Sequence, residues 1–258
     1  MLLPQIDSFS VPINRLASQP YINLICYPTA EKAEAEKRIE ELKKLGVKSI
    51  VFEGRTKIGN LHLLGKGCVG LVVKAELSTG FVALKMRRTD ANRLTMYREA
   101  DLQRLANKIN VGPRIVKSSD NFLLMDLVIG GSINEWIRGL KGRGSTSFLR
   151  KNVKEVLDQS FRLDTAGIDH GELSNLEKHV YVGEKVCIID FETASLNRRV
   201  ANVTSSLQNL FIGGPNARKV CRMLRLKDKE SVITSARYYK ENPCKTTFES
   251  LITNLKLI

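Results

Sequence analysis

The feature that most constrains this chain is a glycine-spaced segment that continues as a β-strand instead of opening a helix. Residues 65–72 read Gly-Lys-Gly-Cys-Val-Gly-Leu-Val, and the β-branched stretch LVVKAEL begins at residue 71. The glycine turn of a dinucleotide-binding fold leads into a helix, so that fold is excluded. The pattern predicts a turn between two antiparallel strands, where backbone N–H groups can approach phosphate oxygens. Taken alone, the segment also fits an ordinary hairpin turn.

A lysine and an acidic residue follow the glycine segment on the next two predicted elements. The predicted returning strand, residues 81–88, contains Lys85 within the run Val-Ala-Leu-Lys, and Ala83 is small enough to leave room for an adenine ring. Glu99 lies fourteen residues after Lys85 on a predicted helix and could pair with it, with Asp101 as the alternative acid. These spacings predict a lysine and a carboxylate on neighbouring elements.

The second half of the chain carries two acidic segments. Residues 167–174 read Gly-Ile-Asp-His-Gly-Glu-Leu-Ser, and residues 186–192 read Val-Cys-Ile-Ile-Asp-Phe-Glu. Asp190 follows an apolar strand and lies eighteen residues after Glu172. An anionic oxygen at such a strand end suits a hard cation such as Mg²⁺.

Hydrophobic periodicity predicts an α+β fold with strands in the first half and helices in the second. The N-terminal unit is expected to be strand–helix–strand, with a strand at 21–28, a helix at 30–45 capped by Thr29, and a strand at 47–54. The further expected strands lie at 61–77, interrupted by the glycine turn, and at 81–88, 114–117, 122–128, 179–182 and 186–189. The further expected helices lie at 92–108, at 133–140 with Ser132 as its cap, and at 148–166, with three or four more after residue 199. We therefore expect three parts, at residues 1–58, 59–128 and 129–258.

Composition limits the classes of protein that remain. The chain has 258 residues and a net charge of +14, from 41 Lys and Arg against 27 Asp and Glu. Its five cysteines are widely spaced, which argues against a disulfide framework or a structural zinc site. No apolar run is long enough to span a membrane, and the first residues do not read as a signal peptide, so we expect a cytoplasmic protein with no membrane partner. The positive charge indicates a polyanionic partner such as RNA, or a solvated surface.

Together these motifs resemble the protein-kinase-like superfamily from about residue 60 to the end of the chain. The order of the glycine segment, Val-Ala-Leu-Lys, the loop at 167–174 and the segment ending in Asp190-Phe191 is the order found in kinases. The chain is most similar in style to the minimal atypical kinases, namely the RIO family and the small kinase of the KEOPS tRNA-modification complex. More specifically, it resembles a family of predicted archaeal serine/threonine protein kinases in F-E-G-R-T (52–56), K-H-V (178–180) and D-F-E-x-A-S (190–195).

This resemblance implies a two-lobed kinase-like fold, with a mainly antiparallel β small lobe, a mainly α large lobe, and residues 1–58 as an N-terminal extension. It implies ATP and Mg²⁺ as cofactors and an unknown protein as substrate. The implied catalytic residues are Lys85, Glu99, Glu172 and Asp190, and the implied metal ligands are Asp190 and Glu177. The implied nucleotide contacts are Gly65, Lys66, Gly67, Cys68, Val69, Gly70, Val72, Ala83, Lys85, Met125, Asp126 and Val128, with the backbone of Asp126 and Val128 binding the base.

The chain departs from the kinase pattern at three positions. Glu172 stands where kinases have the catalytic aspartate, and the extra methylene moves the carboxylate by about 1.5 Å. Glu177 stands where the second metal ligand, an asparagine, is expected, and Glu192 replaces the glycine of Asp-Phe-Gly. The nucleotide-binding half of the pattern is therefore intact and the transfer half is altered.

Three functions follow as alternatives. The first is an ATP- and Mg²⁺-dependent atypical serine/threonine kinase whose visible activity includes autophosphorylation or ATP hydrolysis. The second is a nucleotide-binding pseudokinase scaffold that does not transfer phosphate. The third, compatible with either, is an RNA- or ribosome-associated module, favoured by basic runs such as KGRG at 141–144.

Overall fold

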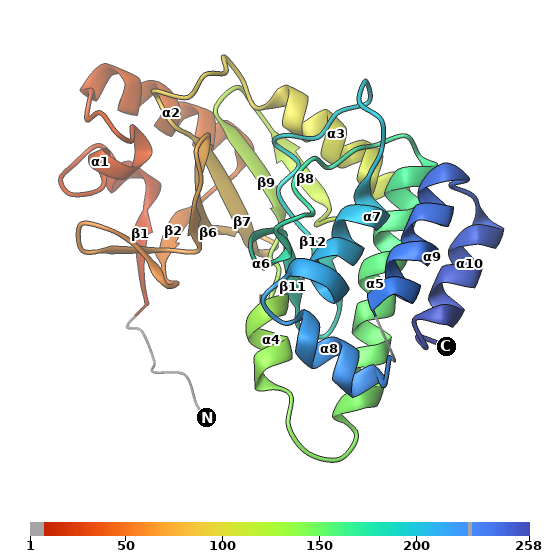
Figure 1. The fold of residues 1–258 in the computed structure, drawn as a ribbon. Helices are drawn as coiled ribbons and strands as arrows, with labels where there is room; N and C mark the ends of the chain where they lie inside the picture. Colours follow the sequence, from red (N-terminus) through yellow and green to blue (C-terminus); the bar gives the residue numbers. More distant parts are fainter. Residues whose placement is uncertain (1–7, 227–228) are drawn as a thin grey trace. The chain divides into compact units, whose positions relative to one another are not determined.

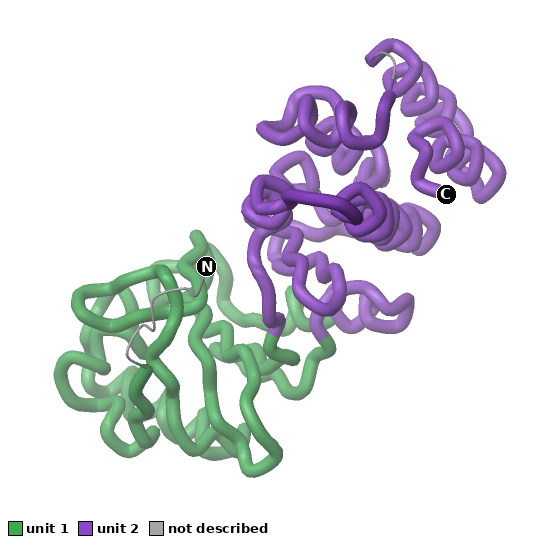
Figure 2. Tube along the Cα trace, turned by 90° about the horizontal axis from the view of Figure 1, so that it is seen from below, with its two compact units in different colours: residues 1–101, 114–127 green, residues 102–113, 128–258 purple. Residues whose placement is uncertain are grey.

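The computed structural model describes residues 8–226 and 229–258, so the first seven residues of the expected N-terminal extension lie outside the described residues. The chain divides into two compact units (Figure 2). Unit 1 contains the described residues up to Asp101 together with Arg114–Leu127. Unit 2 contains Leu102–Pro113 and the described residues from Val128 to Ile258. The expected division at residues 58 and 128 stays a prediction.

Unit 1 is built on one antiparallel sheet with the order β1-β2-β6-β7-β9-β8, and β5 pairs with β6 beside this path (Figure 1). The strands of this sheet are β1 (Phe9–Pro12), β2 (Ser49–Phe52), β5 (Gly65–Lys66), β6 (Gly70–Leu77), β7 (Gly80–Arg87), β8 (Ile115–Ser118) and β9 (Phe122–Asp126). The other elements are a 3₁₀ turn η1 (Ile13–Arg15), α1 (Ile22–Ile25), α2 (Lys32–Leu45), and a separate hairpin of β3 (Thr56–Ile58) and β4 (Leu61–Leu63). Helix α3 (Tyr97–Lys108) begins in unit 1.

One face of this sheet forms the main core of unit 1. Alternate residues of β6, such as Leu71 and Val73, are buried there against apolar residues of α1 and α2, including Leu24 and Leu42. This alternation is the expected pattern for a strand whose two faces meet different surroundings. The N-terminal segment therefore covers one face of the sheet that also contains the glycine segment.

The N-terminal segment also differs from its prediction. Residues 21–28 were expected to be a strand, but Ile22–Ile25 forms the short helix α1, and the first strand of the segment is β1, which pairs with β2. An apolar run this short fits either a strand or a buried helical turn. The cap of α2 is Glu31 and not Thr29.

A buried arginine holds the N-terminal segment to the rest of unit 1. Arg38 of α2 has no exposed surface. Its Nη1 donates to the carbonyl oxygens of Ile25, at 2.9 Å, and Arg87, at 2.6 Å, and its Nε lies 2.7 Å from Glu34 Oε1. Its Nη2 donates to Asn121 Oδ1 at 3.1 Å. A single side chain thus joins α1, α2, β7 and the turn before β9.

Unit 2 is mainly helical and carries one small antiparallel sheet of β10, β11 and β12 (Figure 1). Its strands are β10 (Gly131–Ser132), β11 (Val180–Val182) and β12 (Val186–Ile188). Its helices are α4 (Ile133–Gly139), α5 (Ser145–Thr165), α6 (Leu176–His179), α7 (Asn202–Leu207), a π-helical turn η2 (Gln208–Gly213), α8 (Ala217–Leu224), α9 (Lys229–Glu241) and α10 (Lys245–Asn254).

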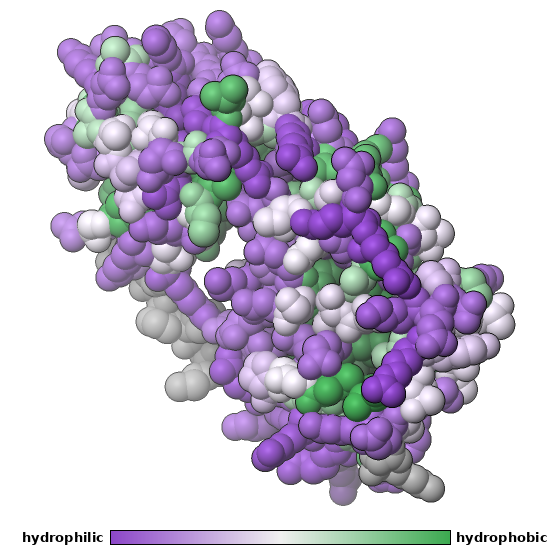
Figure 3. Space-filling view, turned by 45° about the horizontal axis from the view of Figure 1, so that its top comes forward, coloured by the Kyte–Doolittle hydropathy of each residue, from purple (hydrophilic) through white to green (hydrophobic). Residues whose placement is uncertain are grey.

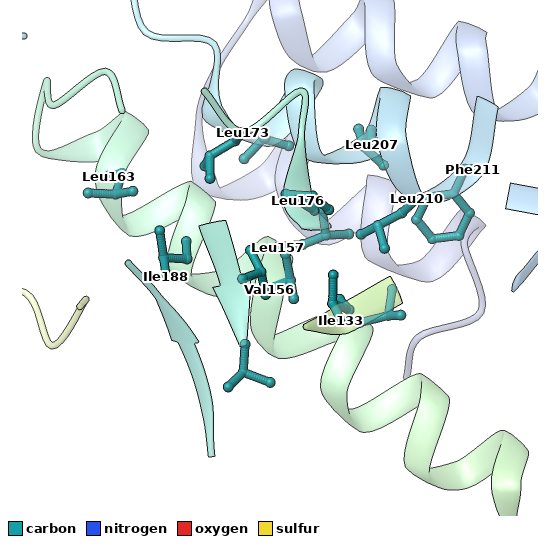
Figure 4. Close-up of a cluster of buried hydrophobic side chains, with 14 of the residues drawn as sticks. Ile133, Val156, Leu157, Leu163, Leu173, Leu176, Ile188, Leu207, Leu210 and Phe211 are labelled. Carbon is teal, nitrogen blue, oxygen red and sulfur yellow. The ribbon is translucent and has the colours of Figure 1, made fainter. Parts of the chain in front are cut away.

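The long helix α5 runs through the core of unit 2. Figure 4 shows Val156 and Leu157 of α5 among buried residues from α4, α6, β12 and α7, such as Ile133 and Ile188. Ser132 caps α4 as predicted, because its hydroxyl accepts a hydrogen bond from the Glu135 N–H. The core of this unit thus fixes the ends of the strands and loops that carry its acidic segments.

The described residues form an α+β protein with antiparallel sheets, which confirms the predicted class. Figure 3 shows a face on which hydrophilic residues predominate, with smaller apolar groups among them. Within the described residues, no helix has the length and apolar character needed to cross a bilayer.

Candidate functional site

Four of the residues predicted to contact the nucleotide belong to a small apolar cluster that is separate from the main core of unit 1. Ala83 of β7 is the register partner of Met125 of β9, and both belong to a small buried apolar cluster. Val69 and Val72 pack against this cluster while staying partly exposed. Four predicted nucleotide contacts from three separate parts of the sequence therefore belong to one apolar cluster.

The glycine segment forms the predicted hairpin between β5 and β6, in which Gly65 pairs with Val72. The N–H of Gly67 donates to the carbonyl of Gly70 at 2.8 Å, which closes a tight turn around the exposed Cys68. A Cβ at Gly70 would lie 2.9 Å from Met86 O and 3.2 Å from the Lys85 side chain. Only glycine fits this close approach.

The N-terminal segment reaches the glycine hairpin through Tyr27. The Nζ of Lys66 donates to the Tyr27 hydroxyl at 2.7 Å and lies 4.7 Å from the centre of its ring. The Arg88 guanidinium lies 5.1 Å from the same ring centre, and its backbone N–H donates to Val69 O at 2.8 Å. The side chain of Lys66, a predicted nucleotide contact, is thus bound to Tyr27 in this structure.

A buried ion pair joins β7 to α3. Lys85 Nζ lies 2.7 Å from Glu99 Oε1, and these side chains are only 5% and 1% exposed. Arg93 Nη1 lies 3.8 Å from the other carboxylate oxygen. The sequence therefore identified the correct acid, Glu99, although α3 begins at Tyr97 and not at residue 92. We name Gly70, Lys85 and Glu99 the lysine cluster.

The hydrogen bonds of Asp126 limit which of its backbone groups could contact the base. Its N–H donates to Arg114 O at 2.9 Å, and its exposed carboxylate lies 3.3 Å from Arg114 Nη2. Because the N–H of Asp126 is already bonded to Arg114 O, a backbone hydrogen bond from Asp126 to the base would have to use its carbonyl oxygen. Val128 is the first residue of the long second segment of unit 2.

In unit 2, the loop at 167–174 is fixed by backbone and side-chain hydrogen bonds. Asp169 and Ser195 exchange two backbone hydrogen bonds, at 2.9 and 2.8 Å. The His170 N–H donates to Asn202 Oδ1 at 2.9 Å, and Asn202 Nδ2 donates to Ile168 O at 2.7 Å. The α7 residue Asn202 therefore holds both sides of this loop.

His170 is a neutral, buried side chain. Burial, and secondarily the charge of His179, lowers the pKa of His170 to about 4. Its Nε2 lies 3.1 Å from the carbonyl oxygen of Ile189, which requires the hydrogen to be on Nε2. Its ring packs edge-on against Phe191 at 5.1 Å between ring centres. His170 thus ties the loop to the backbone directly before Asp190.

Glu172 lies half-buried on this loop. Its Oε2 accepts a hydrogen bond from the Thr193 hydroxyl at 3.1 Å and lies 3.8 Å from His179 Nε2. The Thr193 hydroxyl also lies 2.9 Å from the carbonyl oxygen of His170, so it contacts both the loop backbone and the Glu172 carboxylate. We name His170, Glu172, His179 and Thr193 the loop cluster.

Asp190 follows β12 with a backbone φ of +70°, which is rare for a residue with a side chain. Phe191 is buried in the unit 2 core, and a Cβ at Gly112 would approach its ring to 2.7 Å. The Asp190 and Glu192 side chains are half-buried, and their carboxylate oxygens lie within 4.8 Å of each other. The sequence reasoning noted Glu192 only as a departure, although its spacing of two residues from Asp190 was a usable signal for a second oxygen ligand.

Glu177 lies elsewhere on the unit 2 surface. Its Oε1 is 3.4 Å from Arg138 Nη2 and its Oε2 accepts from Asn134 Nδ2 at 3.3 Å, both on α4. The carboxylate is about half exposed. The predicted metal role of Glu177 stays a prediction, but this carboxylate is engaged by an arginine.

Comparison with known proteins gives no relative to argue from. No family model matches the chain, and no curated protein matches it. The chemistry that the chain can support therefore depends on the residues of the lysine cluster and the loop cluster. The lysine cluster offers a fixed ammonium group in unit 1, and the loop cluster separately offers a hydrogen-bonded carboxylate in unit 2.

Proposed function

We propose that this chain is an ATP- and Mg²⁺-dependent atypical serine/threonine protein kinase with a two-lobed kinase-like fold. The observation that carries the proposal is the buried pair of Lys85 and Glu99 directly beside Gly70. Burying two charges costs solvation free energy that their attraction barely repays, so such a pair is a weak way to stabilise a fold. It is, however, a good way to hold an ammonium group in one place for a phosphate.

In this proposal unit 1 binds the nucleotide. The apolar surface of Val69, Val72, Ala83 and Met125 would contact the adenine ring, since aromatic bases bind to flat apolar surfaces. The glycine hairpin would cover the phosphates with its backbone N–H groups. Lys85 would bind phosphate oxygens, oriented by Glu99.

Unit 2 would supply the groups for transfer. The oxygen of a serine or threonine hydroxyl forms a bond to the γ-phosphorus, the bond from that phosphorus to the β–γ bridging oxygen breaks, and ADP leaves. The hydroxyl proton passes to the carboxylate of Glu172, which the Thr193 hydroxyl contacts. With water as the acceptor, the same step is ATP hydrolysis.

The acidic residues near β12 suit Mg²⁺. Asp190 and Glu192 provide two carboxylates close together, and Mg²⁺ prefers such oxygen ligands. When bound, Mg²⁺ neutralises charge on the phosphates. The unusual backbone conformation of Asp190 supports a functional role, because a positive φ persists only where the surroundings impose it.

Transfer of labelled γ-phosphate from ATP tests this proposal, with the chain itself and a mixed serine/threonine protein as acceptors. We expect labelled product with the wild type and at least a hundredfold less with Lys85→Ala or Asp190→Ala, about the range of a lost catalytic group. Lys74→Ala, on the neighbouring strand, is the matched control and should keep wild-type transfer. Transfer of labelled phosphate by both variants at the wild-type level would contradict the proposed kinase function.

Two observations favour a second candidate, a nucleotide-binding scaffold without transfer. Glu177 is paired with Arg138, and Glu172 replaces an aspartate. This candidate predicts a rise in melting temperature with ATP and no labelled product with Mg²⁺ or Mn²⁺. Measurable turnover that Glu172→Gln abolishes would rule it out. An RNA partner and a cytoplasmic location stay predictions for either candidate.

A further inference from the structure

Arg198 lies against the loop that carries Glu172. Its Nε is 2.8 Å from Asp169 Oδ2, and its Nη2 donates to Thr193 O at 2.7 Å and to Asp169 O at 3.5 Å. A Cβ at Gly171 would collide with Nη2, so the guanidinium packs directly on the backbone preceding Glu172. Thr193, which binds Arg198 through its carbonyl, binds Glu172 through its hydroxyl.

One edge of this guanidinium remains available. Within residues 8–226 and 229–258, Nη1 of Arg198 makes no hydrogen bond to protein, and the side chain is 47% exposed. Its acidic partner Asp169 is only 10% exposed, so the acid is below the surface and the arginine is on it. The neighbouring Arg199 is exposed and donates a hydrogen bond to the backbone carbonyl of Lys240 at 3.0 Å. The loop that carries Glu172 is therefore bordered by an exposed guanidinium, that of Arg198, which has one unused donor group.

The exposed donor group of Arg198 has a chemical consequence for the acceptor. A hydroxyl must come close to Glu172, whose negative charge repels an acidic substrate. A planar guanidinium with a free edge binds a carboxylate or phosphate with short, charge-assisted hydrogen bonds. Arg198 would offset this repulsion and strengthen the binding of a substrate that carries an anionic group near the hydroxyl.

We propose that the phosphoacceptor is an acidic polypeptide, whose anionic side chain close to the acceptor serine or threonine binds Arg198. This inference rests on the proposed kinase function and adds the class of substrate. The net charge of +14 favours the same class, since a basic protein attracts acidic chains over long range. Arg198 thereby becomes a specificity-determining residue.

The test uses alanine-based peptides with one serine and one glutamate, moved through the three positions on each side, against peptides with glutamine in its place. Binding is measured by fluorescence anisotropy and transfer by kcat/KM, at fixed ionic strength. We expect the wild type to prefer one glutamate peptide by about tenfold, the range for a hydrogen bond to a charged group. Arg198→Gln should reduce that ratio to about one, and Arg198→Glu should favour the corresponding lysine peptide.

Arg143→Ala is the matched control, because it removes one exposed positive charge from a loop of the same unit and should keep the preference. If Arg198 only braces the loop, both peptides lose activity equally and the ratio is unchanged, which overturns the inference. Equal binding of the glutamate and glutamine peptides by the wild type, or no binding of either, also overturns it. Selective binding without any transfer would instead uphold the role of Arg198 and contradict the proposed kinase function.

Discussion

Lys85 Nζ lies 2.7 Å from Glu99 Oε1, and the two side chains are almost completely buried. Removing the acid takes this charge partner away from a buried ammonium group, so we expect Glu99→Ala to lower the free energy of unfolding by about 3–5 kcal/mol. The double variant Lys85→Met with Glu99→Leu should recover most of this loss, because it leaves neither charge. Urea unfolding followed by circular dichroism measures both. A cost below about 1 kcal/mol for Glu99→Ala would mean that the pair is not desolvated in solution.

Gly70→Ala tests the close approach of the glycine hairpin to Lys85. The new Cβ would lie 2.9 Å from Met86 O and 3.2 Å from the Lys85 side chain, so either β7 or the lysine must shift. We expect at least about tenfold weaker ATP binding by calorimetry, with the fold retained, since a misplaced phosphate ligand loses most of its contribution. Gly65→Ala is the control, because its Cβ would have only an ordinary contact at 3.9 Å. Equal effects of the two substitutions would contradict the account.

Arg38→Leu tests whether the N-terminal segment is an integral part of unit 1. The substitution leaves the carbonyl oxygens of Ile25 and Arg87 and the carboxylate of Glu34 without their buried donor. We expect a loss of about 3–5 kcal/mol in the free energy of unfolding, whereas the exposed neighbour Lys37→Ala should change it by less than about 0.5 kcal/mol. Urea unfolding followed by circular dichroism measures the free energy of unfolding of both variants. A small effect of Arg38→Leu would make the segment an accessory layer.

The stability of unit 2 should depend on pH through His170. Burial lowers the pKa of His170 to about 4, whereas an unfolded chain titrates near 6.5. Between these values the unfolded state binds more protons, so the free energy of unfolding falls as the pH is lowered. From pH 7 to pH 5 we expect a loss of about 2 kcal/mol from this group.

The fluorescence of Trp136, the single tryptophan and a residue of unit 2, reports this unfolding. The loss between pH 7 and pH 5 should shrink by about 2 kcal/mol in His170→Gln. His62→Gln in unit 1 should leave it unchanged. The same pH dependence in His170→Gln and the wild type would show that His170 is not held neutral.

Much of this fold could be predicted because local chemistry determined it. The glycine hairpin was predicted because β-branched residues follow Gly70, and the helix after Ser132 because a serine cap precedes an amphipathic stretch. The pairing of Lys85 with Glu99 followed from placing a strand before a helix.

What could not be predicted depends on tertiary contacts. Within the run at 21–28, Ile22–Ile25 forms a helix whose apolar residues belong to the core of unit 1, and no local pattern specifies this packing. The start of α3 is set by the hydrogen bond from the Met96 N–H to Asp120 O, between residues remote in sequence. The approach of Arg198 to Gly171 and the engagement of Glu177 by Arg138 likewise require the folded loop positions.

In the proposed reaction, Glu172 receives the proton of the acceptor hydroxyl, whereas residues of unit 1 bind ATP. A single-turnover measurement with enzyme in excess over γ-labelled ATP and Mg²⁺, paired with a calorimetric Kd for ATP, tests it most directly. We predict that Glu172→Gln slows transfer by at least about a hundredfold and leaves the Kd within about twofold, while Glu172→Asp keeps measurable transfer. Wild-type rates in Glu172→Gln, or a wild type that binds ATP and transfers nothing, would contradict the account.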